Sequence, residues 1–481
     1  MTPAIETQSM QEPPPARLAV TDESLPRQSK GLRRHFWSFL SPFQLIDATR
    51  LRQLSYSIFD QGFSVGGMFL ANIALARTQT KEEYGIFALT YSVFTFLSGL
   101  HNAAVLEAYT IYGSGRYHRH FVSYARLLWR SNAWLCLGLT CAVAAVWGAL
   151  AQLAPRYASR TLLGLALACG VLLTASFLRR TFYMQRRPQL AARFSAIFFS
   201  LNVALLWLLV RTNRLNGFWA FAIAALAWSA ASLFVAREIP GSSPQESFLQ
   251  IKPRYWSEHW KYSRWVLVTA LVFQFLTQGY YWLAAGILSV KQAGELRALN
   301  NLVMPLDQVF GALTLLILPA LSLRFASQRF AGLVPLWRRY CFGWLLVTGS
   351  FAVSLLLVGK PAMHALYAGR FDDVAALLPV LAFLPVVMGI GNTINAALKA
   401  MEKPHAVFYA YVASGAATFL IGLPLILRFA VRGAVFGMLA SAAVYTGALG
   451  IAFAAYSRAE ARTARFCVSE KETSLSSAPG S

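Results

Sequence analysis

Several ionisable and amide side chains interrupt the apolar stretches of this sequence, where spanning helices would carry them into a membrane. They are Asp60, Glu107, Arg179, Arg180, Gln274, Gln278, Arg297, Asp307 and Lys399. An ionisable group is costly in hydrocarbon, so such residues usually face a polar cavity or a partner. Basic side chains there could bind a phosphate, with Arg in bidentate fashion. The amides could hydrogen-bond the hydroxyl groups of a ligand, and we take all nine residues as candidates for lining a cavity.

Each of these positions also has a structural interpretation. Arg179, Arg180 and Lys399 lie near the ends of apolar runs, from which long basic side chains can reach the interface. Glu107 follows the second run and could be interfacial. Asp60 and Asp307 are deeper, yet either could pair with a neighbouring Arg or Asn. Gln274 and Gln278 are one turn apart and share a helix face, so they could also bond a neighbouring helix.

The composition excludes an ordinary soluble protein. Of the 481 residues, 57% are hydrophobic and only 13% are charged, about half the 25% that is usual for soluble domains. Intrinsic disorder is excluded as well, because it requires low hydrophobicity. The net charge of +23 comes from basic residues between apolar runs. That placement is typical of cytoplasmic loops, so we expect no nucleic-acid partner.

Twelve apolar runs approach the roughly 20 residues that a spanning helix needs. They fall at about 54–76, 84–106, 132–153, 161–178, 194–210, 216–236, 265–289, 296–320, 341–358, 374–397, 405–427 and 433–456. The eighth run is the weakest, because Arg297, Asn300, Asn301 and Asp307 interrupt it. With the N-terminus inside, most of the 43 Lys and Arg residues fall on inner segments, whereas each outer connection carries two. This bias predicts that both termini are cytoplasmic.

These runs and loops predict five regions along the chain. Residues 1–50 form a cytoplasmic tail with an interfacial segment over 31–46, which carries Arg and aromatic residues. Residues 51–240 form an N-terminal six-helix bundle, 241–263 a cytoplasmic linker, and 264–457 a C-terminal six-helix bundle. Residues 458–481 are Ser-rich and polar, and we expect a disordered cytoplasmic tail there.

A weak internal repeat relates the two bundles. KEEYGIFAL (Lys81–Leu89) resembles KQAGELRAL (Lys291–Leu299), and the join MQRRP (Met184–Pro188) resembles MEKP (Met401–Pro404). Gly217 and Gly433 each follow an outer turn. All these pairs are about 210 to 217 residues apart and occur in the same order. The predicted fold is therefore an all-α polytopic membrane protein, with about 12 transmembrane helices in two parallel six-helix bundles around a central cavity.

The sequence resembles a family of exporters over about residues 50 to 456. The stretches that carry the resemblance are NIALAR (Asn72–Arg77), EYGIFAL (Glu83–Leu89), Gly391–Asn392, NAAL (Asn395–Leu398) and EKP (Glu402–Pro404). They resemble the polysaccharide-flippase branch of the multidrug/oligosaccharidyl-lipid/polysaccharide exporter superfamily, the Wzx-type O-antigen and exopolysaccharide translocases. Members often carry an acidic residue in the seventh helix, where this chain has Tyr280 and Tyr281. An ion-coupling scheme that depends on that acid is therefore in doubt.

The resemblance implies a transporter of the bacterial inner membrane that flips lipid-linked oligosaccharide from the cytoplasmic to the outer leaflet by alternating access. Its implied partners are the polyprenyl-phosphate glycan, membrane lipids, H⁺ or Na⁺ as coupling ion, and the polysaccharide assembly machinery. We expect no catalytic residue, metal or cofactor. One alternative is a drug/cation antiporter of the same superfamily, in which Asp60 or Asp307 would bind H⁺ or Na⁺. The other is a membrane enzyme of polysaccharide assembly, disfavoured by short outer loops and the lack of a clustered acidic or His pair.

Overall fold

A computed structural model describes residues 48–114, 117, 121–235 and 253–476. Every regular element among these residues is a helix. The chain from Gln53 onward forms one compact unit. The predicted interfacial segment over 31–46, and the part of the predicted linker before residue 253, lie outside the described residues.

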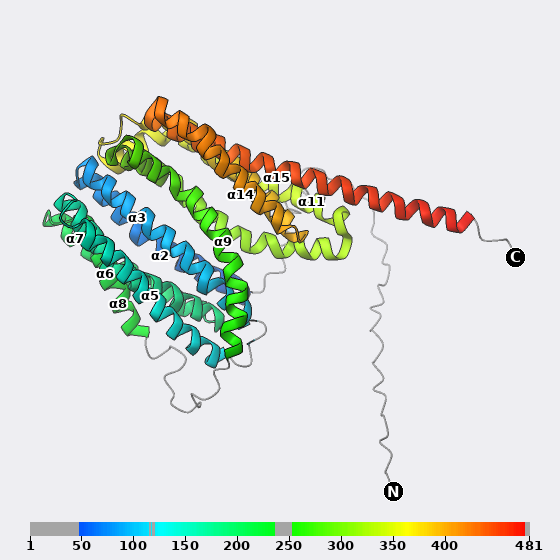
Figure 1. The fold of residues 1–481 in the computed structure, drawn as a ribbon, viewed down its shortest axis with the longest axis horizontal. Coiled ribbons are helices and arrows are strands. Elements are labelled where there is room, and N and C mark those ends of the chain that lie inside the picture. The colour runs from blue at the N-terminus through cyan, green and yellow to red at the C-terminus, as the bar shows by residue number, and fades with distance from the viewer. Residues whose placement is uncertain (1–47, 115–116, 118–120, 236–252, 477–481) are drawn as a thin grey trace, which may run out of the picture. The chain divides into compact units, whose positions relative to one another are not determined.

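The first half of this unit packs its helices antiparallel in one group (Figure 1). It consists of α2 (Ala48–Thr78), α3 (Lys81–His101), the π-helical segment η2 (Asn102–Leu106), α4 (Glu107–Ser114), α5 (Phe121–Leu150), α6 (Arg156–Met184), α7 (Pro188–Arg211) and α8 (Gly217–Val235). The closest packing pairs α6 with α5 and α8.

The second half repeats this arrangement with more interruptions. It consists of α9 (Pro253–Leu283), η6 (Ala284–Leu288), α10 (Val290–Asn301), α11 (Met304–Tyr367), η7 (Ala375–Leu377), α12 (Leu378–Leu381), α13 (Phe383–Ala400), α14 (Pro404–Ala417), η8 (Thr418–Gly422) and α15 (Leu423–Ser476). Two of these are helix pairs, because the backbone turns sharply at Arg329 (φ 50°) in α11 and at Ala430 (φ 53°) in α15. α13 packs against both α11 and α15.

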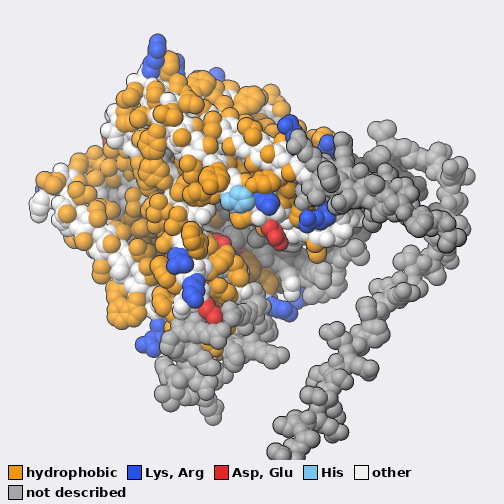
Figure 2. Space-filling model, turned by 45° about the vertical axis from the view of Figure 1, so that its right-hand side comes forward, with side chains coloured by type: hydrophobic (Ala, Val, Ile, Leu, Met, Phe, Trp, Pro, Cys, Tyr) orange, Lys and Arg blue, Asp and Glu red, His pale blue; other side chains and the backbone are white. Residues whose placement is uncertain are grey.

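Nine stretches of the described chain are long and apolar enough to cross a membrane, and Pro404–Ala459 contains two of the predicted runs. The predicted run at 84–106 is not among them, because α3 begins with three charged residues. Much of the predicted run at 296–320 consists of side chains outside the described part. Hydrophobic side chains nevertheless dominate the face in Figure 2, and its few charged groups lie mainly near its centre and edges. The all-α, two-half membrane fold is as predicted.

The backbone supports the internal repeat at three corresponding turns. After α6, Arg186 has φ 57° and Arg187 has φ −116°, ψ 59°; after α13, Glu402 has φ 60° and Lys403 has φ −112°, ψ 53°. The outer turns at Asn213 (φ 52°) and Ala430 (φ 53°) also correspond. α3 and α10 both begin at a capping hydroxyl, because Thr80 accepts from the Glu83 N–H and Ser289 accepts from the Gln292 N–H.

α9 joins the two halves and begins earlier than predicted. The linker was expected to extend to residue 263, but the helix starts at Pro253. Its first turns pack on the first half, where His259 is fully buried. Nδ1 of His259 accepts from the Tyr124 hydroxyl at 2.8 Å, and Nε2 donates to the Ala104 carbonyl at 2.9 Å. These contacts give residues 253–263 a helical surface to dock on, so they do not form a free loop.

The chain after residue 457 also differs from the expectation of disorder. α15 continues as a helix to Ser476. Residues 457–471 are rich in Ala, Arg and Glu, which have high helix propensities. Because a helix extends one residue at a time at little cost once it has formed, the spanning helix continues into this polar sequence.

Candidate functional site

A cavity of ≈ 390 Å³ lies in the second half, beside α3 of the first. α9, α10, α11, α13, α14 and α15 contribute to its wall, and α3 contributes Tyr91 and Thr95. Two of the predicted site residues, Gln278 and Arg297, line it. Most of the remaining wall is apolar or aromatic, so a few polar groups determine what it can bind.

Arg297 is the one charged residue among the described side chains of the cavity wall. It is 7% exposed, and its Nε is buried without a hydrogen-bond partner. The guanidinium carbon lies 4.8 Å from the centre of the Tyr91 ring and 5.3 Å from that of Tyr281. No described carboxylate forms an ion pair with it. A cation held over aromatic rings, with its Nε–H unpartnered and no described carboxylate opposite, is suited to bind an anion.

Neutral polar groups share the cavity wall with Arg297. Oε1 of Gln278 and Oδ1 of Asn301 are buried without a hydrogen-bond partner, and both residues line the cavity. Elsewhere in the wall, the hydroxyls of Tyr280 on α9 and Ser441 on α15 are 2.8 Å apart, and the Thr418 hydroxyl is 3.0 Å from that of Ser441. Unpartnered amide oxygens accept hydrogen bonds, so this wall can receive a ligand that carries hydroxyl donors beside an anionic group.

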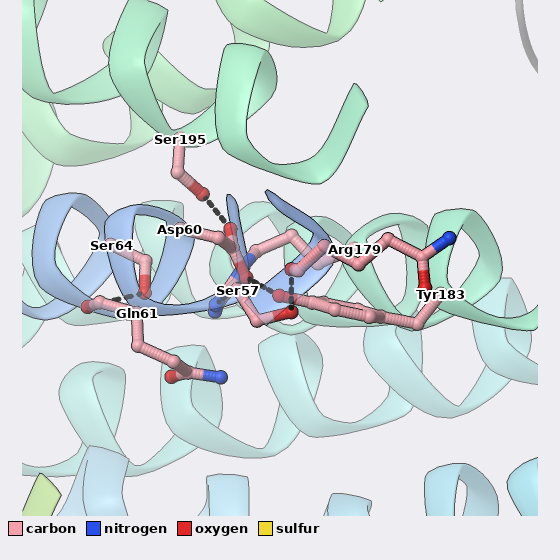
Figure 3. Close-up of polar contacts among 8 residues, drawn as sticks. Ser57, Asp60, Gln61, Ser64, Arg179, Tyr183 and Ser195 are labelled. Atoms are coloured by element: carbon pink, nitrogen blue, oxygen red, sulfur yellow. Dashed lines mark hydrogen bonds and ion pairs between the residues drawn. The ribbon is translucent and has the colours of Figure 1, made fainter. Parts of the chain in front are cut away.

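Asp60 has a different environment from the one predicted for a cavity residue. It is 0% exposed and is not part of the cavity wall. Arg179 Nε and Nη2 bind its two carboxylate oxygens at 3.0 Å and 2.7 Å. The hydroxyls of Tyr183 and Ser195 also donate to it (Figure 3). The Asp60 carboxylate thus links α2 to α6 and α7. Because the Arg179 guanidinium is paired with this carboxylate, it is not available to bind a ligand.

Three further predicted residues, on α4, α6 and α13, lie near one another beyond the C-terminal end of α3. Glu107 on α4 accepts from the Tyr262 hydroxyl at 2.9 Å. Its charge acts on Arg180 of α6 and on Lys399 of α13. Arg180 also donates to Oδ1 of Asn102 at 3.3 Å. We call Glu107, Arg180 and Lys399 the inner charge group; it draws on both halves of the chain.

The last two predicted residues are separate from these clusters. Gln274 packs against α3 at Gly99, where even a Cβ would come within 1.7 Å of its Nε2. It therefore serves helix packing, although it shares a face with Gln278. Asp307 lies in the first part of α11, and its side chain is outside the described part.

α3 and α10, which carry the repeated motif, meet at the opposite end from the inner charge group. Lys81 at the start of α3 lies 3.2 Å from Glu295 and 2.7 Å from Asp373 of the second half. Burial alone would lower the pKa of Lys81, but hydrogen bonds to these carboxylates outweigh it and raise the pKa above 10.5. Lys81 is therefore charged at physiological pH. In addition, Arg370 donates to the backbone carbonyl of Gln79.

The same two helices approach each other closely at glycines of the repeat. A Cβ on Gly85 would lie 2.0 Å from the Val290 carbonyl oxygen, and one on Gly294 would lie 2.9 Å from the Gly85 Cα. Only residues without a side chain permit this backbone contact. The two repeat-related glycines thus pack on each other. The repeated motif at Lys81–Leu89 and Lys291–Leu299 allows α3 and α10 to pack closely at the interface of the two halves.

A buried polar network lies beside these glycines. Asn72 Oδ1 accepts from the Tyr84 hydroxyl at 2.6 Å and from Asn301 Nδ2 at 2.9 Å. The Tyr367 hydroxyl donates to the Ala298 carbonyl at 3.0 Å. We call the Lys81 ion pairs, the Gly85–Gly294 contact and this network together the α3–α10 junction. It holds the two halves together at one end of the cavity.

Gly85→Val is expected to open the α3–α10 junction. The added side chain cannot occupy the space of the Val290 carbonyl, so α10 must move away from α3. We expect labelling of a cysteine placed at Asn72 by a water-soluble maleimide to rise at least several-fold. The control is Gly138→Ala in the same background, because nothing lies within 4 Å of a Cβ at Gly138. Equal labelling of both variants would contradict a close contact at Gly85.

Three members of the cavity wall, Tyr91, Asn300 and Asn301, were not predicted from the sequence as site residues. Tyr91 gave no signal, because a single Tyr in an apolar helix is more often part of a core. Asn300 and Asn301 were noted only as interruptions of the eighth run, although their position beside Arg297 was the available clue. Among the described residues, no three His, Cys, Asp or Glu side chains are placed to hold a metal.

Comparison with solved structures identifies the fold. An inward-facing multidrug resistance MATE family transporter of the MOP superfamily superposes with a TM-score of 0.68 at 11% identity, over 84% of this chain and 99% of that one. An outward-facing one gives 0.62 at 12% identity, over 84% and 96%. A MOP superfamily transporter from Pyrococcus furiosus, described as having a binding pocket of reverse polarity, gives 0.64 at 9% identity, over 84% and 94%.

Comparison at the level of sequence identifies the family. No curated protein matches the chain. The model of a family described as polysaccharide biosynthesis protein matches residues 74–329, which is more than half of the chain. This region includes the Gly85–Gly294 contact of the α3–α10 junction, Arg297 and the Asp60 partner Arg179. The chain therefore belongs to the polysaccharide biosynthesis protein family and is a multi-pass membrane protein with the fold of the MOP superfamily transporters on which it superposes.

Proposed function

We propose that this transporter flips a lipid-linked oligosaccharide, carried on a polyprenyl phosphate or pyrophosphate, from the cytoplasmic to the outer leaflet for polysaccharide biosynthesis. The observation that carries the proposal is the cavity, whose wall holds a guanidinium with no described carboxylate partner and two unpartnered amide oxygens. A sugar phosphate offers the complementary groups, because its phosphate oxygens accept and its hydroxyls donate hydrogen bonds. Membership of the polysaccharide biosynthesis protein family supports this substrate class.

The transport step requires shielding and no bond making. A glycan phosphate cannot cross about 30 Å of hydrocarbon unaided, because its hydration would be lost without replacement. The cavity would receive the polar head at Arg297 and the amides, while the apolar chain stays in the lipid. Movement of the halves would then expose the head to the other face.

We place the protein in the bacterial inner membrane with both termini cytoplasmic. The excess of Lys and Arg on the segments between α4 and α5, α6 and α7, and α8 and α9 supports this orientation. The α3–α10 junction is then on the outer side and the inner charge group on the cytoplasmic side. We infer that a closed junction corresponds to the state that receives substrate from the cytoplasm.

A drug/cation antiporter is less well supported. A cationic drug needs an anionic or electron-rich site, and no carboxylate is among the described side chains of the cavity wall. Tyr280 and Tyr281 occupy the positions where an acidic residue would serve. Asp60 already has Arg179 to balance its charge, so it needs neither H⁺ nor Na⁺ to remain buried.

The proposal is tested in the host cell. The gene is deleted, and a membrane-impermeant glycan-binding probe is applied to spheroplasts before and after permeabilisation. We expect lipid-linked glycan to accumulate where only permeabilised cells bind the probe. Wild-type protein and the Gly138→Ala control should both restore exposure on intact spheroplasts.

Two results would overturn the proposal. Normal exposure of the glycan, with reduced efflux of dyes or cations, would establish the antiporter in its place. A glycan of altered composition or length on the normal side would indicate a membrane enzyme of polysaccharide assembly.

A further inference from the structure

The guanidinium of Arg297 lies between side chains of the two halves. Arg297 belongs to α10, and Tyr281 to α9, which are both in the second half. Tyr91, whose ring centre is the closer at 4.8 Å, belongs to α3 of the first half. The Trp282 indole N–H also donates to Ser92 Oγ across the halves at 2.7 Å. The surroundings of Arg297 are thus assembled from both halves of the transporter.

Tyr91 is coupled by its helix to the α3–α10 junction. Tyr84, Ala88 and Tyr91 follow one another at spacings of four and three residues, which places them on one face of α3. On α10, Gly294 and Arg297 are likewise three residues apart. Separation of α3 from α10 at the glycines would therefore also draw the Tyr91 ring away from the guanidinium.

We propose that Tyr91 is a positioning residue, which with Tyr281 clamps Arg297 into a diphosphate-binding site that exists only while the α3–α10 junction is closed. The two rings hold the guanidinium in one orientation, in which its Nε–H has no protein partner and can donate to a phosphate oxygen. When the junction opens, one ring is withdrawn and the guanidinium loses its fixed orientation. This inference rests on the proposed function in that the ligand is the phosphate part of the substrate.

Because the phosphate site exists only while the α3–α10 junction is closed, the affinity for phosphate differs between the two sides of the membrane, which gives transport a direction. Phosphate is bound tightly when the cavity is reached from the cytoplasm and weakly once the outer junction has parted. By thermodynamic linkage, a variant that opens the junction must weaken phosphate binding even though it touches no ligand. A site made by Arg297 alone would not show this dependence.

The test measures the affinity of inorganic pyrophosphate by isothermal titration calorimetry. Full-length protein is placed in nanodiscs of phosphatidylcholine, so that no anionic lipid competes. Relative to wild type, we expect about tenfold weaker binding for Tyr91→Leu, and binding close to wild type for Tyr91→Phe, which keeps the ring. Gly85→Val should also weaken binding about tenfold, whereas the matched Gly138→Ala should not.

The outcomes separate this inference from the function that it rests on. Wild-type affinity in both Tyr91→Leu and Gly85→Val would overturn the clamp and leave the flippase intact. Weakening by Gly85→Val alone would overturn the role of Tyr91. No binding by wild-type protein would overturn the phosphate site itself. Because Gly85→Val lies outside the cavity, the test does not depend on the folding of Tyr91→Leu.

Discussion

Arg297→Gln is expected to abolish export while leaving the protein as stable as wild type or more stable. Each charge-assisted hydrogen bond contributes about 1.5–3 kcal/mol, so its loss lowers phosphate affinity by roughly 10- to 100-fold. The folded state gains, because a cation that is 7% exposed and has no described ion-pair partner is costly to bury. A residue that lowers stability and is needed for activity is typical of a functional site.

Two measurements check this prediction. Complementation of the deletion strain reports export, and the temperature at which half of the detergent-solubilised protein loses its monodisperse peak reports stability. Arg297→Lys should restore export in part, because it keeps the charge and loses the planar fork. A large fall in the stability of Arg297→Gln would instead assign Arg297 to the architecture, and normal export by this variant would remove it from the site.

The fold could be predicted from local signals in the sequence. Gly, Pro and Asn residues at the ends of apolar runs determine the turns at Arg186, Asn213, Glu402 and Ala430, and these turns repeat in the structure. The order of the runs then defines two halves. The prediction of a linker was wrong from Pro253 onward, because the helix there is held by contacts with residues that are distant in the sequence. His259 is buried by Tyr124, which is 135 residues away in the chain, and no local pattern reports such a contact.

The candidate site could be predicted only in part. The hydropathy of the surrounding sequence indicates how deep in the membrane a charged residue lies. It does not indicate which other residue, if any, forms an ion pair with it. Asp60 and Arg179 are 119 residues apart, and the sequence presented each as a cavity residue, although they bind each other. Arg297 was singled out by the same signal and does line the cavity. What distinguishes the two arginines is whether a carboxylate lies opposite, which depends on the packing of α2 on α6.

The Asp60–Arg179 pair leads to the second large effect, since Asp60→Asn is expected to destabilise the protein strongly. Asp60 is 0% exposed and accepts from Arg179, Tyr183 and Ser195. Neutralising it leaves the mostly buried guanidinium of Arg179 without a counter-ion. Breaking a buried ion pair in this way costs about 3–5 kcal/mol. The measurement is again the temperature of half-loss of the monodisperse peak.

Two further variants determine whether the pair is architectural. Asp60→Leu combined with Arg179→Met replaces both charges by apolar groups, and should recover most of the stability, because the desolvation cost of both ions disappears. Asp372→Asn removes a carboxylate that is 46% exposed and paired with His364, and should cost at most about 1 kcal/mol. If the double variant is stable and exports glycan, α2, α6 and α7 need only to be held together at Asp60. If it is stable but inactive, the pair takes part in transport, and Asp60 belongs to the site after all.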